Sequence, residues 1–363
     1  MHFPLLVWEQ RKLGEVLLVN SGKDYKNLNK GNIPVYGTGG YMLSVNRALS
    51  NENAIGIGRK GTIDRPQYLI APFWTVDTLF FLTVKNQNDL KFFYALFQKI
   101  NWKKYDESTG LPSLSKSTLN NIFLKNPNYK EQKKIGLLLS QIEVLITLQQ
   151  RKLEYFMTIK AELLRSIFPN TVGKRGLHIS DQPWKLQTMN DIFKEKNIKN
   201  EHGKLLSVSI SKGIYPFSEN ERKNNSSNNK SKYKEVKYND IAYNSMRMWQ
   251  GALGVSKYDG IVSPAYTVIT AKKQENPLFY YYYFKNKRML FNFRQHSQGL
   301  TSDTWNLKFP LFKKIIIQTP ISKKEEQIIA NLFKTLDQNI IYTKTKIEKF
   351  NYIKQFLLQN MFI

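Results

Sequence analysis

Two short motifs contain residues that could support catalysis, but neither has the neighbours that its chemistry needs. The run GTGG at 37–40 is not followed by the Gly-Lys-Ser/Thr of a phosphate-binding loop. Its flanks predict strands rather than the strand-to-helix turn of a dinucleotide site. Glu235-Val236-Lys237 could serve a metal-dependent nuclease, but that chemistry needs a second carboxylate, which the sequence does not place. We therefore expect no catalytic residue in either motif.

The remaining residue types argue against other kinds of active site. NPNY at 126–129 has the form of the NPPY motif of amino-methyltransferases, but it lacks the second proline and no glycine-rich cofactor loop accompanies it. The chain has no cysteine and only four, scattered histidines, which argues against disulfides, a thiolate nucleophile and a metal site. The joint absence of these motifs favours a binding protein over an enzyme.

The charge indicates what the protein binds. The formal net charge is +27 and the isoelectric point is near 9.8. Such an excess destabilises a folded chain by self-repulsion unless a polyanion relieves it, and nucleic acid is the leading candidate. An anionic membrane surface and a lysine- and asparagine-rich genome are competing explanations. Because no apolar run is long enough for a membrane span and no signal peptide is evident, we expect a cytoplasmic protein.

The longest elements of the chain occur twice. Residues 130–168 and 324–362 align without a gap at an offset of 194 residues (324 minus 130). Their apolar residues recur in steps of three and four, which predicts one apolar stripe along each of two helices of nearly forty residues. Helices of this length must pack on another helix, and each has its own repeat as the natural partner. Gln149 and Thr343 interrupt the two stripes at the same place, either to set register or as tolerated residues of a partly exposed layer.

The segments before the long helices predict two globular domains of mixed structure. Aromatic segments at 89–100 and 276–293 predict helices, and we expect Tyr280–Tyr283 to pack in a core rather than stack on bases. Trp8 and Trp184 begin the domains. Ser-x-Gly-Leu recurs at 108–111 and 297–300. Short β-branched and aromatic runs predict strands at 33–42, 54–63, 73–84, 204–210, 239–246 and 260–271.

With these features the chain resembles the specificity subunit of type I restriction–modification enzymes over essentially its whole length. The duplicated helix starts KEQKKI and KEEQII and the two tryptophan domain starts carry part of the resemblance. The rest lies in NIPVYGTGGYM, AIGIGRKGTID and PFWTVDTLFFL of the first domain and in YNSMRMWQGALGVSKYDGIVSPAYTV of the second. The chain is short for this family, and its first domain is compact.

The resemblance implies an α+β fold with two globular target recognition domains, each a mixed β-sheet with helices. They would alternate with two long helices that pair as an antiparallel coiled coil, and the internal duplication would give pseudo-two-fold symmetry. The implied boundaries are 1–128 for the first domain, 129–170 for the central helix, 171–322 for the second domain and 323–363 for the C-terminal helix.

The same resemblance implies a non-catalytic subunit that binds double-stranded DNA. Each domain would read one half of a bipartite, asymmetric target in the major groove, and linking two readers raises affinity through effective concentration. The paired helices would set the spacing and dock two methyltransferase subunits, and motor-nuclease subunits would join for cleavage. The chain itself would bind no cofactor, since S-adenosylmethionine, ATP and Mg would belong to the partner subunits.

Residue type and turn context indicate which side chains touch DNA. Phosphates are contacted mainly by Lys and Arg, and bases are read by Arg, Asn, Gln and Ser/Thr. In the first domain the candidates lie in two glycine-rich turns and are Tyr36, Thr38, Tyr41, Arg59, Lys60 and Thr62. In the second domain the primary candidates are Asn244, Arg247, Trp249, Gln250, Lys257 and Tyr266, and the secondary ones are Arg294, His296 and Gln298. The alternative is that the glycines only form tight turns and that Arg59 is solvated.

The stretch NSMRMWQGALGVS at 244–256 predicts a hairpin. Alternation along a strand would bury Met246 and Met248 on one side and direct Arg247 and Trp249 to the other. The alternative is that Met248 and Trp249 are both buried in the hairpin.

Three other functions remain open from the residues. The chain could be a DNA methyltransferase or nuclease in its own right, against which the missing cofactor loop argues. It could be a basic coiled-coil adaptor that never reads sequence, with lysine content set by the genome. It could also be the specificity subunit of a type II-like or modification-only system, which differs only in its partners.

Overall fold

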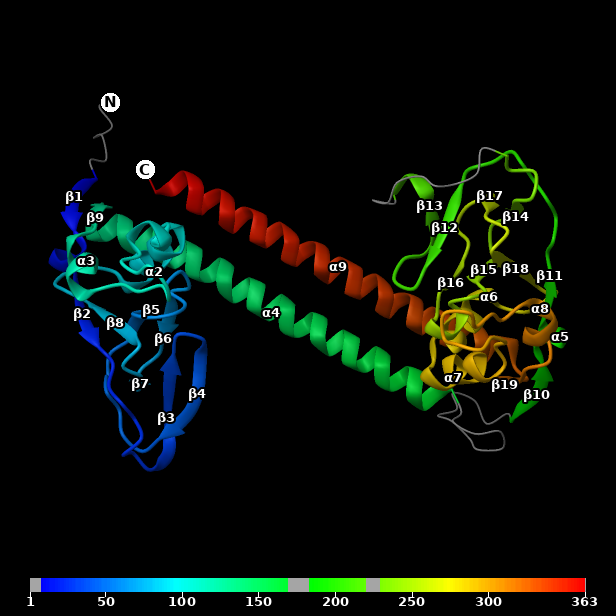
Figure 1. Ribbon diagram of the computed structural model, residues 1–363, viewed down its shortest axis with the longest axis horizontal. Coiled ribbons are helices and arrows are strands. Elements are labelled where there is room, and N and C mark those ends of the chain that lie inside the picture. The colour runs from blue at the N-terminus through cyan, green and yellow to red at the C-terminus, as the bar shows by residue number, and fades with distance from the viewer. Residues whose placement is uncertain (1–7, 169–182, 220–228, 363) are drawn as a thin grey trace. The chain divides into compact units, whose positions relative to one another are not determined.

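The computed structural model describes residues 8–168, 183–219 and 229–362 (Figure 1). The chain divides into two compact units. Unit 1 comprises Met1–Arg151 and Thr343–Ile363, and unit 2 comprises Lys152–Tyr342. Each unit therefore combines one globular domain with a part of each long helix.

The two long helices are α4 (Tyr129–Ile167) and α9 (Lys323–Met361), each of 39 residues. In unit 1 Lys354 Nζ of α9 lies 2.8 Å from Glu143 Oε1 of α4. In unit 2 Lys160 of α4 pairs with Asp337 of α9. Residues 143 and 160 are as far apart in sequence as 337 and 354, so both ion pairs fit one antiparallel register. This confirms the predicted antiparallel helix pair, within each unit by its own contacts (Figure 1).

The domain of unit 1 is built on an antiparallel four-stranded sheet in the order β2-β8-β5-β6. These strands are Leu17–Ser21, Leu79–Val84, Ala54–Gly58 and Gln67–Leu69. A second sheet, β4-β3-β7, joins Gly40–Val45, Lys30–Gly37 and Trp74–Thr75. β1 (Glu9–Lys12) pairs with β9 (Phe123–Asn126) next to the start of α4. The helices are α1 (Leu13–Val16), α2 (Leu90–Lys99), η1 (Trp102–Tyr105) and α3 (Lys116–Asn121).

The domain of unit 2 repeats the main sheet with the order β11-β18-β15-β16. These strands are Phe193–Glu195, Tyr266–Ala271, Ile241–Asn244 and Leu253–Val255. β10 (Trp184–Thr188) pairs with β19 (Ile316–Pro320), as β1 does with β9. The smaller pairs are β12 (Leu206–Ser209) with β13 (Gly213–Pro216), and β14 (Lys234–Val236) with β17 (Gly260–Val262). The helices are α5 (Met189–Ile192), η2 (Phe217–Glu219), η3 (Met248–Gln250), α6 (Pro277–Lys285), α7 (Lys287–Gln295) and α8 (Phe309–Phe312).

Side-chain contacts confirm the duplication that the sequence predicted. Trp8 Nε1 donates to Glu131 Oε1 at 3.1 Å, and Trp184 Nε1 donates to Glu325 Oε1 at 3.3 Å. Each tryptophan thus ties the first strand of its domain to the start of the following long helix. Among the described residues, no helix is long and apolar enough to cross a membrane.

Each domain core is also closed by a phenylalanine near the end of the long helix that follows the other domain. In unit 1 Phe362 lies 5.4 Å from Phe92 and 6.1 Å from Trp8, between ring centroids. In unit 2 Phe168 makes the corresponding contacts at 5.7 Å with Phe279 and 6.4 Å with Trp184. Both phenylalanines are buried, and burial of such large rings stabilises each unit.

The aromatic segments form helices, with one correction. Tyr280, Tyr282 and Tyr283 are buried, which confirms their predicted place in a core. The segment at 276–293 is not one helix, because Asn286 adopts an extended conformation (ψ 137°) between α6 and α7. Its side chain accepts from the backbone N–H of Arg288 and donates to the carbonyl of Leu164. These two hydrogen bonds connect the break to α7 and to α4.

Candidate nucleic-acid interface

The first glycine-rich turn of unit 1 is the tip of the β3–β4 hairpin. Tyr36 and Tyr41 face each other across the hairpin with ring centroids 6.5 Å apart, and Tyr41 is largely exposed. Gln67 Nε2, on β6, donates to the carbonyls of Gly37 at 2.9 Å and Thr38 at 3.2 Å. The hairpin tip is therefore anchored to the edge of the main sheet.

The second glycine-rich turn follows β5 and lies next to this tip. Arg59 and Lys60 are exposed, and the Arg59 guanidinium lies 5.8 Å from the centre of the Phe80 ring. Gly61 has φ +91°, and a Cβ there would lie 3.9 Å from the Thr38 hydroxyl. Thr62, the next residue, is half-buried. The structure thus brings the candidates of the first domain together from two separate turns.

The Ser-x-Gly-Leu loop of unit 1 packs against the same turn. The backbone N–H of Leu114 donates to the carbonyl of Arg59 at 2.9 Å, and that of Gly61 donates to Pro112 at 2.8 Å. Asp106 Oδ1 accepts from the backbone N–H groups of Ser108 and Ser113, and these bonds lower the pKa of its carboxyl below the ordinary range. The hydrogen bonds to Asp106 close the loop, and Leu111 is exposed to solvent.

In unit 2 the stretch after β15 is a turn and a short 3₁₀ helix, which corrects one expectation. β15 and β16 form the predicted hairpin, but their connection does not alternate. Asn244 Oδ1 accepts from the N–H of Met246, and Gly251 at φ +83° closes η3. As a result Met248 is buried, as predicted, but Met246 is exposed. A strand-like alternation fails here because the chain must reverse within eight residues (245–252).

The principal candidates of unit 2 lie around this connection. Arg247 is half-exposed and its Nη1 lies 3.9 Å from the exposed Asp303 carboxylate. Trp249 is half-buried, donates to the carbonyl of Met246, and meets Trp305 with ring centroids 5.2 Å apart. The Arg294 guanidinium lies 4.8 Å from the Trp305 ring centre, which suits a cation–π contact. Arg247 therefore does not point into the core.

The candidates form two strand-end clusters, one around Arg59 after β5 and one around Arg247 after β15. One backbone hydrogen bond shows that these two clusters occupy the same place in the fold. In unit 2 the N–H of Leu307 donates to the carbonyl of Ser245 at 2.8 Å, as Leu114 does to Arg59 in unit 1. Ser245 directly follows β15, and Arg59 directly follows β5. The two strands hold the same position in their sheets. The candidates of the two domains come from unlike sequence motifs, but they lie at the same position in the fold.

The other candidates of unit 2 are divided by the fold. Asn244 and Tyr266 are register partners in β15 and β18. Tyr266 packs on the small apolar cluster of this domain, and burial raises the pKa of its phenol. Lys257 is exposed beyond the far end of β16 from Gln250, so the structure separates it from Arg247. Gln250, half-buried, ends η3.

The secondary candidates lie on the Ser-x-Gly-Leu loop and the helix before it. His296 caps α7, and its Nδ1 lies 2.8 Å from the carbonyl of Asn292. The backbone of Gln298 exchanges two hydrogen bonds with that of Asn306, which closes the loop around Leu300. Leu300 is fully exposed. The side chains of His296 and Gln298 are exposed on the same loop as Trp305.

Lys285 on α6 supports this surface from beneath. Its Nζ donates to the carbonyl of Gly251 at 2.6 Å and to that of Ile210 at 3.0 Å. Burial lowers the pKa of Lys285 to about 8. Since Gly251 closes η3, this lysine fixes the base of the turn that carries Arg247 and Trp249.

Several contributors to the two clusters were not predicted, among them Trp305, Gln67 and Asp106. Trp305 follows the second Ser-x-Gly-Leu motif within a few residues, so the recurrence of that motif was the available signal. Gln67 and Asp106 act on loops distant in sequence. No local sequence pattern predicts such contacts.

The Glu235-Val236-Lys237 motif lies in an ion cluster. Lys196 Nζ sits 3.1 Å from Glu235 Oε2 and 2.9 Å from Asp240 Oδ2, and Thr270 Oγ1 donates to the other oxygen of Asp240. The ammonium of Lys196 stands between the two carboxylates. The hydrogen bond from Lys196 lowers the pKa of Glu235 below its ordinary value. The arrangement is that of a structural ion pair.

Comparisons with known proteins agree with this architecture. The family model described as type I restriction modification DNA specificity domain matches residues 7–155 and 181–352. The crystal structure of a type I restriction-modification system S subunit from M. genitalium is 14% identical, covers 99% of this chain and 97% of its own, and superposes with a TM-score of 0.71. No curated protein matches the sequence.

Two further structures match over nearly the whole chain with lower TM-scores. An HsdS subunit from Thermoanaerobacter tengcongensis is 12% identical, with a TM-score of 0.47 and coverage of 99% of this chain and 98% of its own. A structure described as explaining complex assembly and conformational transition of the type I R-M system is 12% identical, with a TM-score of 0.49 and the same coverage.

Proposed function

Because the chain belongs to the type I restriction modification DNA specificity domain family, we propose that its two strand-end clusters each read one half of a bipartite DNA target. The family comprises DNA-recognition subunits without catalytic activity, so membership confirms the predicted specificity role and the prediction that the chain is not an enzyme. The residues that read DNA and the partners that assemble on the chain are proposed from the geometry of the two units.

One observation carries the proposal. The residue after β5 and the residue after β15 are each bonded to a Ser-x-Gly-Leu loop, through Leu114 and Leu307. Both places gather exposed cations, namely Arg59 and Lys60 in unit 1 and Arg294 in unit 2, with Arg247 half-exposed beside it. Arg and Lys on such turns suit phosphate contact and guanine readout. The clusters differ in composition, so the two half-sites would differ and the target would be asymmetric.

The long helices supply the second part of the proposal. A 39-residue helix spans about 58 Å at 1.5 Å per residue, which suits a spacer between half-sites. The helix pair would also dock two methyltransferase subunits, and motor-nuclease subunits would join for cleavage. S-adenosylmethionine, ATP and Mg would be bound by those partners and not by this chain. The complex would act in the cytoplasm, on duplex DNA.

Comparison of the host methylome with and without this gene tests the proposal. We expect a split, asymmetric adenine-methylation motif that disappears when the gene is deleted. A chain carrying Arg59→Ala and Lys60→Ala should lose the half of the motif read by unit 1 while the other half is still required. An unchanged methylome would contradict the proposal and leave the adaptor hypothesis standing.

A further inference from the structure

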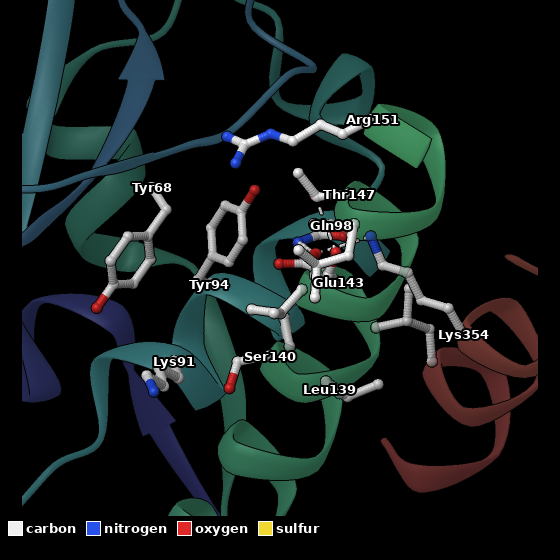
Figure 2. Close-up of a pocket in the computed structure, with 14 residues that line it drawn as sticks. Tyr68, Lys91, Tyr94, Gln98, Leu139, Ser140, Glu143, Thr147, Arg151 and Lys354 are labelled. Atoms are coloured by element: carbon white, nitrogen blue, oxygen red, sulfur yellow. Dashed lines mark hydrogen bonds and ion pairs between the residues drawn. The ribbon is translucent and has the colours of Figure 1, made fainter. Parts of the chain in front are cut away.

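A cavity of about 470 Å³ lies in unit 1 between α2, the stretch 139–151 of α4 and the C-terminal part of α9 (Figure 2). Glu143 lines this cavity, and its Oε1 accepts from Gln98 Nε2 and contacts Lys354 Nζ, both at 2.8 Å. In the described part of the chain, the second oxygen, Oε2, makes no hydrogen bond or ion pair. The apolar and aromatic part of the wall consists of Tyr68, Tyr94, Ala95, Leu139, Val144, Leu148 and Leu358.

The second repeat identifies which residues correspond to this wall. α2 and α6 align at their N-caps, Asp89 and Asn276. The alignment pairs Phe92 with Phe279, which make matching contacts with Trp8 and Trp184 at 5.9 and 6.0 Å. Counted from the caps, Ala95 corresponds to Tyr282. On the long helices the repeat offset relates Leu139 to Phe333 and Glu143 to Asp337.

In unit 2 the corresponding space is filled by Tyr282. Its ring stacks on Phe333 with centroids 5.0 Å apart, and its hydroxyl donates to Asp337 Oδ2 at 2.9 Å. Asp337 Oδ1 pairs with Lys160. The carboxylate thus holds a lysine on one oxygen and a phenol on the other. In unit 1 the lysine is present, but Ala95 stops at Cβ and supplies no phenol.

The surface around the cavity suits a protein occupant. Exposed apolar side chains of α4 border it, with Val144 57% and Leu148 51% exposed. Exposed apolar patches occur at protein–protein contacts as well as at ligand-binding grooves. The equivalent positions of α9 are mainly amides: Leu137, Val144, Leu145 and Leu148 correspond to Asn331, Gln338, Asn339 and Tyr342. The apolar border is therefore a property of α4 and not of the repeat.

We propose that this cavity receives a tyrosine side chain of a partner polypeptide. The ring takes the position that Tyr282 has in unit 2, and its hydroxyl donates to Glu143 Oε2. Exposed Arg151 and Lys91 at the rim favour an acidic residue beside that tyrosine. The identity of the partner, a methyltransferase subunit, rests on the proposed function. Because unit 2 fills its own site, only one of the two matching positions offers this contact.

Titration with p-cresol, the side-chain analogue of tyrosine, tests the cavity on the full chain. We expect one saturable site in the wild type and binding at least fivefold weaker for toluene, which lacks the hydroxyl. Ala95→Tyr should fill the cavity from within, abolish p-cresol binding and raise Tm. Ala95→Met fills it with a flexible chain and serves if the tyrosine variant does not fold. Equal p-cresol binding by the wild type and by a folded, filled variant, or no saturable binding by the wild type, would overturn the proposal.

A reciprocal variant provides the matched control. Tyr282→Ala should open the second site and give a chain that binds two equivalents of p-cresol. If its Tm falls, as removal of a buried ring predicts, added p-cresol should raise that Tm by more than it raises the wild-type value. No gain of binding and no rescue would contradict the equivalence of the two sites.

Calorimetry with the purified methyltransferase subunit tests the occupant. Ala95→Tyr should weaken the binding of one subunit at least tenfold, and p-cresol should compete for the same event in the wild type. Equal affinity of wild type and variant would overturn the tyrosine contact. If neither chain binds the methyltransferase, the partner assignment of the proposed function fails, while the p-cresol titration still decides the cavity.

Discussion

The backbone N–H of Leu307 donates to the carbonyl oxygen of Ser245 at 2.8 Å. This bond joins the second Ser-x-Gly-Leu loop to the first residue after β15. Arg247 on the turn and Arg294 before the loop consequently belong to one surface. In unit 1 the equivalent hydrogen bond, from Leu114 to Arg59, joins the first Ser-x-Gly-Leu loop to the residue after β5. Both clusters are therefore built on the same loop-to-strand contact.

The first prediction concerns Arg247. We expect Arg247→Ala to weaken binding to the specific duplex by about 1–3 kcal/mol, because a guanidinium can read a guanine edge with two hydrogen bonds. Fluorescence anisotropy with specific and scrambled duplexes measures the change. An equal loss on both would assign Arg247 to phosphate, and no loss on either would exclude it as a contact.

Lys257→Ala is the matched control for Arg247. Lys257 is also an exposed cation of unit 2, but it lies beyond the opposite end of β16. We expect its removal to weaken specific and scrambled duplexes equally or to have no effect. A loss confined to the specific duplex would show that the interface extends to the far end of the sheet.

The second prediction concerns Gly136, at the contact of α4 with α2. A Cβ at this position would lie 2.4 Å from Asp89 Oδ1 and 2.6 Å from Phe92 N, which are the N-cap and first turn of α2. Gly136→Ala should therefore lower the free energy of unfolding by roughly 1–3 kcal/mol. Alanine is otherwise about 1 kcal/mol better than glycine in a helix, so the sign of the change is informative.

Urea unfolding followed by circular dichroism measures this effect. The control is Ala330→Gly, since Ala330 holds the position of Gly136 in the second repeat. That change should cost about 1 kcal/mol or more, from helix propensity and lost packing. A stabilising Gly136→Ala would contradict the close approach of α2 to α4.

The third prediction concerns the pH dependence of stability at Glu326. Its side chain is fully buried among Lys323, Glu275 and Tyr280, and burial raises its pKa above the ordinary value of 4.5. A raised pKa means that the folded chain binds this proton more tightly than the unfolded chain. The resulting stability is complete below pH 4.5 and is lost as the pH rises through the folded pKa.

Glu326→Gln should therefore unfold at higher urea concentration than the wild type at pH 7, and the difference should shrink towards pH 4. The first repeat already has a buried glutamine, Gln132, at this position. Gln132→Glu is the converse control and should destabilise the chain at pH 7, with the loss relieved at acidic pH. A pH-independent difference for Glu326→Gln would contradict the raised pKa.

The fourth prediction concerns Lys196, which lies between two carboxylates. Its side chain is 13% exposed and that of Asp240 only 4%. Lys196→Met should lower the free energy of unfolding at pH 7 by about 3–5 kcal/mol, because it leaves a buried charge without its partner. Lys196 holds the pKa of Glu235 low, so this stability is present above the ordinary carboxyl pKa and is lost as the pH falls.

Thermal unfolding at pH 7 and pH 4 measures the effect, and the deficit of Lys196→Met should be smaller at pH 4. Lys237→Met is the control, since this neighbouring lysine is half-exposed and also contacts Glu235. We expect it to change stability little, because exposed ion pairs contribute little. Equal losses for the two variants would show that the cluster does not depend on the buried lysine.

The two long helices were predictable because their apolar stripes are local patterns. The regular steps at 130–168 and 324–362 are repeated nearly without interruption, and both helices were found with 39 residues. The runs 54–63 and 239–246 likewise contain the central strands β5 and β15. The turn after β15 was mispredicted, because Asn244 and Gly251 favour a 3₁₀ turn over an extended strand.

The candidate residues were chosen by type, and their coincidence in space was not visible from the sequence. Arg59 and Arg247 lie in unlike motifs with no common spacing. The turns that carry them correspond, because each turn follows the third strand of its sheet and lies beside the same kind of loop. Lys257 was grouped with Arg247 by sequence proximity, yet β16 separates them.

By itself, the sequence determined the duplication, the helix pair and the family resemblance, since these depend on periodicity and on residue identity at fixed offsets. Only the tertiary structure decided that the strand-end clusters are equivalent and that the space filled by Tyr282 in unit 2 is a cavity in unit 1. Both depend on hydrogen bonds and packing between residues far apart in the chain. Such contacts are set by how the sheets and helices meet, and no local pattern encodes that.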